Sequence, residues 1–348
     1  MHGGSNEAIR IAVCEVFDVS ASMLRVAAVP LELSCRGISP QVTRVSLVAE
    51  RLARAEREGV GLAVFPEACL VECPSLAKLR RREVEALAEP LDGPSVSAVA
   101  EAVEATGVAA GVGLFERAPD GRIFNSYVIC LPGGIHHCHR KLHAFEHRRV
   151  ECGDRFTVFD TAWGVRIGVL IGADNYLIEN VRMNALMGAT LLVAPHRRYL
   201  SASQCDERDS IGALRRWMPA RAADNGMFVA FSGATEGGCE KGNEKGNENI
   251  DETDAALIVD PCGRVLADSV GDESAFVSAE LDTALIGESA GRRWLESRRP
   301  ELYGPLARAA GAARAMPPHT AVAARGGAVP LSVAVVGRDR LTVRWNVR

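Results

Sequence analysis

The sequence of 348 residues has neither an excess of basic side chains nor a long apolar run. Its 40 Lys and Arg residues stand against 44 Asp and Glu residues, which gives a formal net charge of -4 at pH 7. Without a basic excess, the chain has no electrostatic basis for neutralising the phosphates of a nucleic acid. No segment approaches the roughly 18 to 20 uninterrupted apolar residues that a membrane-spanning helix requires. We therefore expect a soluble protein with no nucleic-acid and no membrane partner.

A secretory signal is also missing from the start of the sequence. The first residues, MHGGSNEAIRIAV, carry the acidic Glu7 and have no basic leader that runs into an apolar block. The sequence therefore predicts a cytoplasmic protein.

The cysteines do not form a recognisable pattern. There are 10 of them, no CxxC pair occurs, and they are scattered along a chain that is large enough to bury its own core. We expect reduced thiols, because small disulfide scaffolds have dense and regular cysteine spacing. The run His136 to His139, with Cys138, is expected to be a loop or strand end. Consecutive residues of a strand alternate faces and cannot converge on one metal ion.

Apolar runs of strand length alternate with segments of helical periodicity. The runs 25–31 and 61–66 flank the segment 41–58, whose Val, Leu and Ala residues recur at helical spacing. This alternation predicts the α/β or α+β class, with about 270 residues in one compact unit. The further predicted elements are helices over 79–90, 95–106, 175–188 and 211–224, and strands over 107–116, 122–132, 156–172 (two strands), 191–195 and 227–233.

Three segments are expected to lie outside this core. Residues 1–22 have no clear role, and 241–252 is a polar insert containing KGNE twice, which is typical of a solvated loop. Residues 329–348 alternate polar and apolar side chains around a central turn, which predicts a β-hairpin. An isolated hairpin is marginal in water, so we expect it to dock on the core or on a second subunit. The predicted domains are an extension over 1–23, a main domain over 24–308 and a C-terminal arm over 309–348.

Residues that can carry chemistry are concentrated at three strand ends. Glu67 follows a predicted buried strand in VFPEACL, where a carboxylate serves as an N-cap or as a functional group. Lys141 follows another apolar stretch in HRKLHAFE, a position where basic residues are usually solvated. The third strand ends in a sharp turn at Gly172-Ala173-Asp174, which leads into an amphipathic helix. Such a turn exposes its corner residue and directs backbone N–H groups at a bound group.

In this order, the three segments resemble the carbon-nitrogen hydrolase superfamily, which includes nitrilases, aliphatic amidases and carbamoylases. The resemblance spans roughly residues 24–306. It implies a four-layer α-β-β-α sandwich, assembly as a homo-oligomer through helix faces and the C-terminal arm, and no metal or organic cofactor. Family members use a Glu base, a Lys and a nucleophilic Cys, which Glu67 in FPE and Lys141 in HRK match in part. Where the third motif would read GVLIC, this sequence reads GVLIG, so Gly172 occupies the position of the nucleophile.

The resemblance also implies roles for these residues. Glu67, with its charge balanced by Lys141, would take a proton from a nucleophile and return it to a leaving amine. Lys141 and the backbone N–H of Ala173 would stabilise the oxyanion. Because each residue follows a neighbouring strand of the sheet, we expect Glu67, Lys141 and Gly172 to converge in a pocket.

Three further residues are candidates for binding a substrate. Glu146 would position Lys141 or the substrate, although a surface salt bridge is an equally good interpretation. Asn175 belongs to the predicted start of the helix that follows the third motif. His196 follows the strand LLVAP and is interpreted either as a residue at the pocket mouth or as a loop histidine.

The glycine at position 172 leaves the function open. Glycine has no side chain, so it cannot form the thioester that divides amide or nitrile hydrolysis into two steps. A glycine that only serves a tight turn is one interpretation. Otherwise the chain is a hydrolase whose cysteine was replaced, a natural pseudoenzyme that serves as a binding or assembly subunit, or a protein in which Glu67 activates water. Cys69 is not expected to replace the nucleophile. The sequence therefore predicts a protein that acts on or binds a small-molecule amide or nitrile.

Overall fold

The computed structural model describes residues 23–31, 41–71, 79–198, 211–235, 256–269 and 276–307. The contacts divide the chain into two compact units between Arg298 and Arg299. The described part of the second unit holds only the short helices η4 (Pro300–Leu302) and η5 (Gly304–Ala307). The extension over 1–22, the polar insert over 241–252 and the predicted hairpin over 329–348 lie outside the described residues.

The first of two sheets in the first unit has the strand order β13-β1-β2-β3-β4-β5, with β6 paired to β4. Strands β1, β2 and β3 run parallel, while β4, β5 and β13 are antiparallel to their neighbours in that order. The histidine-rich run is part of β5, so it is a strand and not a loop. The strand bounds are β1 (Leu24–Ala28), β2 (Leu62–Val64), β3 (Ala109–Arg117), β4 (Ile123–Leu131), β5 (Ile135–Arg140), β6 (Val150–Glu151) and β13 (Val277–Leu281).

The second sheet has the strand order β12-β11-β10-β9-β8-β7. Its central strands β8, β9 and β10 run parallel, and their residues are nearly all buried, as is usual for a parallel sheet that is covered on both faces. The strand bounds are β7 (Thr157–Asp160), β8 (Arg166–Val169), β9 (Leu191–Arg198), β10 (Phe228–Thr235), β11 (Ala256–Val259) and β12 (Val265–Asp268).

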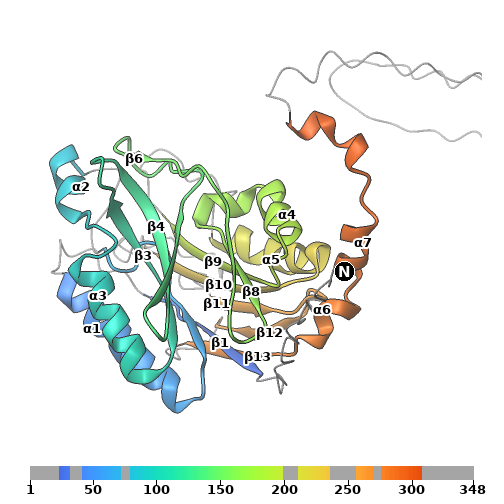
Figure 1. Ribbon diagram of the computed structural model, residues 1–348, viewed down its shortest axis with the longest axis horizontal. Coiled ribbons are helices and arrows are strands. Elements are labelled where there is room, and N and C mark those ends of the chain that lie inside the picture. Colours follow the sequence, from blue (N-terminus) through green and yellow to red (C-terminus); the bar gives the residue numbers. More distant parts are fainter. Residues whose placement is uncertain are drawn as a thin grey trace, which may run out of the picture. The chain divides into compact units, whose positions relative to one another are not determined.

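Helices cover the outer face of each sheet, and the two inner faces pack against each other. Helices α1 (Gln41–Arg57) and α3 (Pro94–Thr106) form an apolar core with the first sheet, and α4 (Ile178–Leu186) and α5 (Ile211–Asn225) form another with the second sheet (Figure 1). A third core of side chains from both sheets lies between them. This is the four-layer α-β-β-α sandwich that the resemblance implied. The remaining helices are α2 (Arg81–Leu87), η2 (Gly172–Tyr176), α6 (Ala284–Glu288) and α7 (Ala290–Glu296).

The helix predicted over 175–188 is divided in two. A turn of 3-10 helix, η2, is followed by Leu177 in extended conformation (φ -87°, ψ 114°), after which α4 begins. Two polar side chains stabilise the turn, because Asp174 accepts from the backbone N–H of Ile171 and Asn175 donates to the carbonyl oxygen of Leu170. The apolar periodicity of the segment did not reveal this local competition with the helix.

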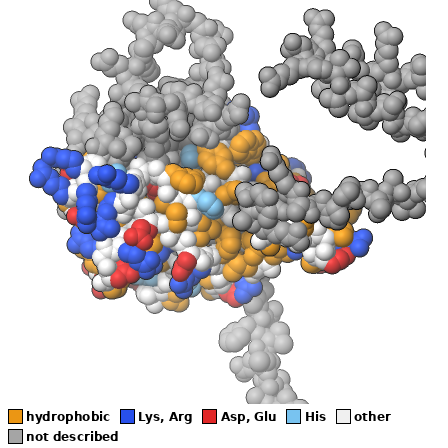
Figure 2. All heavy atoms as spheres, turned by 90° about the horizontal axis from the view of Figure 1, so that it is seen from above, with side chains coloured by type: hydrophobic (Ala, Val, Ile, Leu, Met, Phe, Trp, Pro, Cys, Tyr) orange, Lys and Arg blue, Asp and Glu red, His pale blue; other side chains and the backbone are white. Residues whose placement is uncertain are grey.

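Large apolar side chains are exposed on and beside α4. Apolar side chains gather in one part of the face shown in Figure 2, beside a group of Lys and Arg side chains. Exposed apolar surface of this kind often takes part in protein contacts. The homo-oligomer stays a prediction. Among the described residues, no helix combines the length and the apolar character that crossing a bilayer requires. The large apolar side chains that are exposed on and beside α4 are Leu177, Ile178, Met183, Leu186 and Met187, and Trp217 is exposed on α5.

A close backbone contact fixes the turn that carries Glu67. Ala68 has a φ of +49°, in the left-handed region that residues other than glycine seldom adopt. A Cβ on Gly113 of β3 would overlap the Ala68 nitrogen and lie 3.0 Å from the Ala68 Cα. The backbone N–H of Leu70 donates to the carbonyl oxygen of Gly113 over 3.0 Å. The absence of a side chain at Gly113 thus allows the turn after β2 to lie against the sheet.

We therefore expect Gly113→Ala to lower the free energy of unfolding by about 1–3 kcal/mol, because backbone atoms have to move to make room. Urea denaturation followed by circular dichroism measures this loss. Gly287→Ala is the control, since nothing lies within 4 Å of a Cβ at that position and alanine favours a helix such as α6 more than glycine does, so this variant should lose no stability. Equal stabilities of the two variants would contradict the predicted overlap of a side chain at position 113 with the turn after Glu67.

Candidate active site

Glu67, Lys141 and Gly172 converge, although they follow strands of two different sheets. Glu67 follows β2 and Lys141 follows β5 in the first sheet, whereas Gly172 begins the turn after β8 in the second. Lys141 Nζ donates to Glu67 Oε1 over 2.7 Å. A Cβ built on Gly172 would overlap Glu67 Oε2 and lie 3.1 Å from Glu67 Cδ. The predicted convergence is therefore present, but the expectation that the three strands are neighbours in one sheet was wrong.

A buried network of charges surrounds the Lys141 ammonium. Lys141 Nζ also donates to Glu146 Oε2 over 3.0 Å, and Asn125 Nδ2 donates to Glu67 Oε1 (2.7 Å) and to Glu146 Oε1 (2.5 Å). The side chains of Lys141, Glu67 and Glu146 are at most 3% exposed. Burial alone would lower the pKa of Lys141, but the carboxylates of Glu146 and Glu67 outweigh it and raise this pKa above its usual range. At neutral pH Lys141 is a cation and not a nucleophile.

Position 172 has a left-handed backbone conformation at the turn that follows β8. Its φ is +47°, in the left-handed region that glycine adopts at little cost. The Glu67 carboxylate fills the place that a side chain at this position would need. The backbone N–H of Arg197 on β9 holds that carboxylate from the other side, donating to Glu67 Oε2 over 3.0 Å. Three donors from three segments thus fix the orientation of the Glu67 carboxylate.

These observations can be set beside known proteins. The sequence profile of the carbon-nitrogen hydrolases matches residues 25–290. The chain belongs to the carbon-nitrogen hydrolase family. An (R)-stereoselective amidase from Pseudomonas sp. is 32% identical over 250 residues, which are 70% of this chain and 81% of that protein.

Solved structures of the same superfamily share the fold. The carbon-nitrogen hydrolase from Helicobacter pylori G27 superposes with a TM-score of 0.69 at 20% identity, and the match covers 83% of this chain and 99% of that chain. A Cys-to-Ala mutant of the amidase from Nesterenkonia sp. AN1 in complex with butyramide gives a TM-score of 0.58 at 20% identity, with coverage of 81% and 97%. At this identity the likeness shows the fold alone.

The structure also places the three residues that were predicted to bind a substrate, Glu146, His196 and Asn175. Glu146 is buried, so its interpretation as a surface salt bridge was wrong. His196 lies in β9 and is buried, with its ring centroid 6.1 Å from that of Phe231, so it is not a loop histidine. Asn175 uses its amide group to hold the turn, donating to the carbonyl oxygens of Leu170 (2.9 Å) and Gly172 (3.3 Å). Their contacts with a substrate stay predictions.

Two residues of this network were missed in the sequence. Asn125 is a polar residue inside the apolar strand β4 and is fully buried, and this contrast was the signal that could have revealed it. In the sequence Arg197 is followed by a second arginine, and such pairs are commonly solvated, yet the side chain of Arg197 is buried in the structure. Its guanidinium donates to the carbonyl oxygens of Ala68 (3.4 Å) and Val71 (3.1 Å). It therefore stabilises the strained turn that follows Glu67.

Cys69 does not supply the missing nucleophile in this structure. Its Sγ accepts from the backbone N–H of Gly113 over 3.4 Å and is fully buried behind the turn. Burial raises the pKa of the Cys69 thiol to about 11, so it is not a thiolate at neutral pH. Within the described ranges, no cluster of three or more His, Cys, Asp or Glu side chains is arranged to hold a metal ion.

Proposed function

We propose that this member of the carbon-nitrogen hydrolase family binds a small-molecule amide or nitrile at the Glu67–Lys141–Gly172 site and does not turn it over through a thioester. The observation that carries the proposal is a complete buried network of Glu67, Lys141, Glu146 and Asn125 beside a residue that has no side chain. Buried charges are costly unless they have partners, and in this network both carboxylates contact the same ammonium. The amidase relative and the butyramide complex named above support an amide as the ligand.

The polar groups of the site match those of an amide. The Lys141 ammonium and the backbone N–H of Ala173 are donors for the carbonyl oxygen, and the Glu67 carboxylate is an acceptor for the amide N–H. Because Gly172 lacks a thiol, no covalent bond to the carbonyl carbon forms at this position. Binding without acyl transfer is the expected result, which is the behaviour of a binding subunit or a pseudoenzyme.

A second candidate function is hydrolysis by water that Glu67 activates. It is favoured by the position of the Glu67 carboxylate, which lies where the side chain of a nucleophile would begin. Glu67 would take one proton from water while the oxygen attacks the carbonyl carbon, and would return that proton to the nitrogen as the C–N bond breaks. The products would be a carboxylic acid and an amine or ammonia. This route forms no covalent intermediate with the protein.

Calorimetric titration with butyramide and a panel of small amides and nitriles tests both candidates. We expect saturable binding, and a Kd that rises about 10- to 100-fold in Glu67→Gln, because a hydrogen bond to a charged group contributes about 1.5–3 kcal/mol. Glu301→Gln, in which an exposed carboxylate is replaced, is the control. Ammonia released by the unaltered chain but not by Glu67→Gln would establish the second candidate. No binding across the panel would refute the proposed ligand class.

A further inference from the structure

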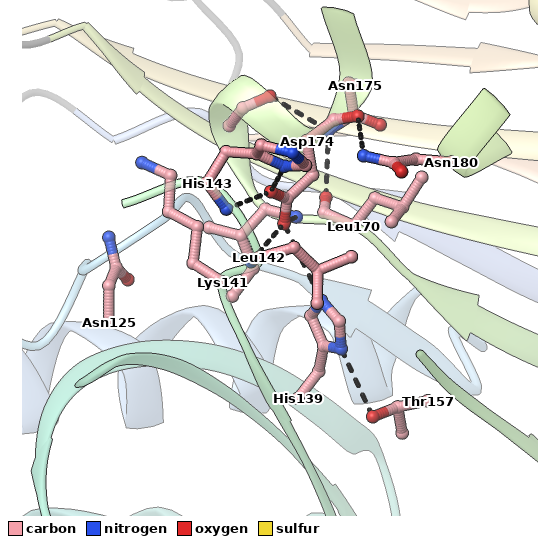
Figure 3. A network of polar contacts seen from close by, with 12 residues as sticks. Asn125, His139, Lys141, Leu142, His143, Thr157, Leu170, Asp174, Asn175 and Asn180 are labelled. Atoms are coloured by element: carbon pink, nitrogen blue, oxygen red, sulfur yellow. Dashed lines mark hydrogen bonds and ion pairs between the residues drawn. The ribbon is translucent and has the colours of Figure 1, made fainter. Parts of the chain in front are cut away.

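A second buried polar cluster lies next to the site, around the carboxylate of Asp174 (Figure 3). This carboxylate accepts from the backbone N–H groups of Ile171 (3.2 Å), Leu142 (3.1 Å) and His143 (2.8 Å). Two of these donors directly follow Lys141, and the third directly precedes the turn η2. One carboxylate therefore joins the segment that carries Lys141 to the turn that carries the backbone N–H of Ala173.

Two histidine rings contact the same carboxylate. His143 Nδ1 lies 3.0 Å from Asp174 Oδ1, and His139 Nε2 lies 3.7 Å from Asp174 Oδ2. The side chain of His139 is completely buried, and its other ring nitrogen, Nδ1, lies 3.2 Å from Thr157 Oγ1 on β7. The Thr157 hydroxyl in turn lies 3.2 Å from the carbonyl oxygen of Cys138. The contacts form a continuous chain from Cys138 to Asp174.

The Asp174 carboxylate is ionised. Burial would raise the pKa of Asp174, but the contacts from His139 and His143 and the N–H of Leu142 outweigh it and hold this pKa well below its usual range. The other ionisable groups around His139 are Tyr127, its partner on β4, and His137 and Lys141, each two residues away along the chain. None of these three is an anion at neutral pH, so Asp174 is the anion that faces His139.

We propose that Asp174 and His139 are positioning residues, which hold the Lys141 ammonium and the Ala173 N–H at a fixed separation. These two donors belong to segments of different sheets, so the hydrogen-bond ladders of the strands do not set the distance between them. A binding site needs its groups within about 0.5 Å of the productive geometry. The bonds from Asp174 to both segments supply this restraint.

His137→Gln is the matched control for tests of this cluster, because His137 lies on the same side of β5 as His139 and stacks on Phe159 with ring centroids 3.7 Å apart.

Hydrogen exchange of single backbone amides tests the positioning role. We expect the amides of Leu142 and His143 to exchange at least about tenfold faster in Asp174→Asn and to be unchanged in His137→Gln. If Asp174→Asn does not fold, His139→Gln should show the same change with a smaller magnitude. Unchanged exchange in a folded Asp174→Asn, or in His139→Gln where only that variant folds, would refute the role.

A second readout connects the cluster to the ligand, and this part rests on the function proposed above. The affinity for butyramide should fall about tenfold in Asp174→Asn, whereas His137→Gln should bind like the unaltered chain. If the unaltered chain binds no amide while the exchange results are as expected, the proposed function fails and the positioning role stands. If butyramide binds equally well to the unaltered chain and to Asp174→Asn, the positioning role fails and the proposed function stands.

Discussion

Replacing Lys141 with Met should lower the free energy of unfolding by about 3–5 kcal/mol, the range found when one partner of a buried ion pair is removed. The Lys141 ammonium contacts both Glu67 and Glu146, and all three side chains are buried. In Lys141→Met the two carboxylates would stay in the interior without the cation between them, while Met has nearly the same length and apolar volume. The loss of unfolding free energy therefore reports the removal of the charge and not a change in packing. Urea denaturation of both proteins at neutral pH gives the difference.

Two further variants separate this effect from others. Arg81→Met removes an exposed partner of Glu85, and its loss should stay below about 1 kcal/mol because solvent screens such pairs. Adding Glu67→Gln and Glu146→Gln to Lys141→Met should recover part of the stability, since neutral amides are less costly to bury than unpaired carboxylates. A loss in Lys141→Met no larger than that in Arg81→Met would contradict the buried network.

The layers of the fold could be predicted because they depend on local patterns. Apolar periodicity changed from strand to helix spacing along the chain, and α1 (Gln41–Arg57) and β4 (Ile123–Leu131) lie within a few residues of their predicted bounds. The pattern does not tell to which sheet a strand belongs. For that reason Gly172 and Lys141 were assigned to neighbouring strands, although their strands β8 and β5 lie in different sheets.

The site was predictable where a residue type stood out from its surroundings. Glu67 is a charged residue after the apolar strand β2, whereas Lys141 follows β5, whose residues are mostly polar. Both lie in the network as expected. Asn125 and Arg197 both contact Glu67, which lies more than 50 residues away from each of them along the chain. No local pattern contains such contacts. Asp174 was visible only as part of a helix start, whereas its carboxylate joins two segments through hydrogen bonds to backbone N–H groups.

Introducing a cysteine at position 172 should give the largest change in activity. Gly172→Cys supplies a thiol at the corner beside the Glu67 carboxylate, which can take its proton. We expect hydrolysis of butyramide to rise at least about 10²-fold, the lower end of what a positioned base contributes. Mass spectrometry of the variant with its substrate should detect an acyl adduct on the introduced thiol. A broad amide panel that gives no adduct would show that the site is not arranged for acyl transfer to a thiol at position 172.

The same substitution should also destabilise the protein, and Gly172→Ala separates this cost from the chemistry. Any Cβ at this position overlaps Glu67 Oε2, and the φ of +47° is strained for a residue with a side chain. Both variants should therefore lose about 1–3 kcal/mol of unfolding free energy as the carboxylate moves. Only the variant with the thiol can form an adduct. Hydrolysis in both variants, at equal rates, would mean that displacement of Glu67 and not the thiol restores activity, as expected if Glu67 activates water.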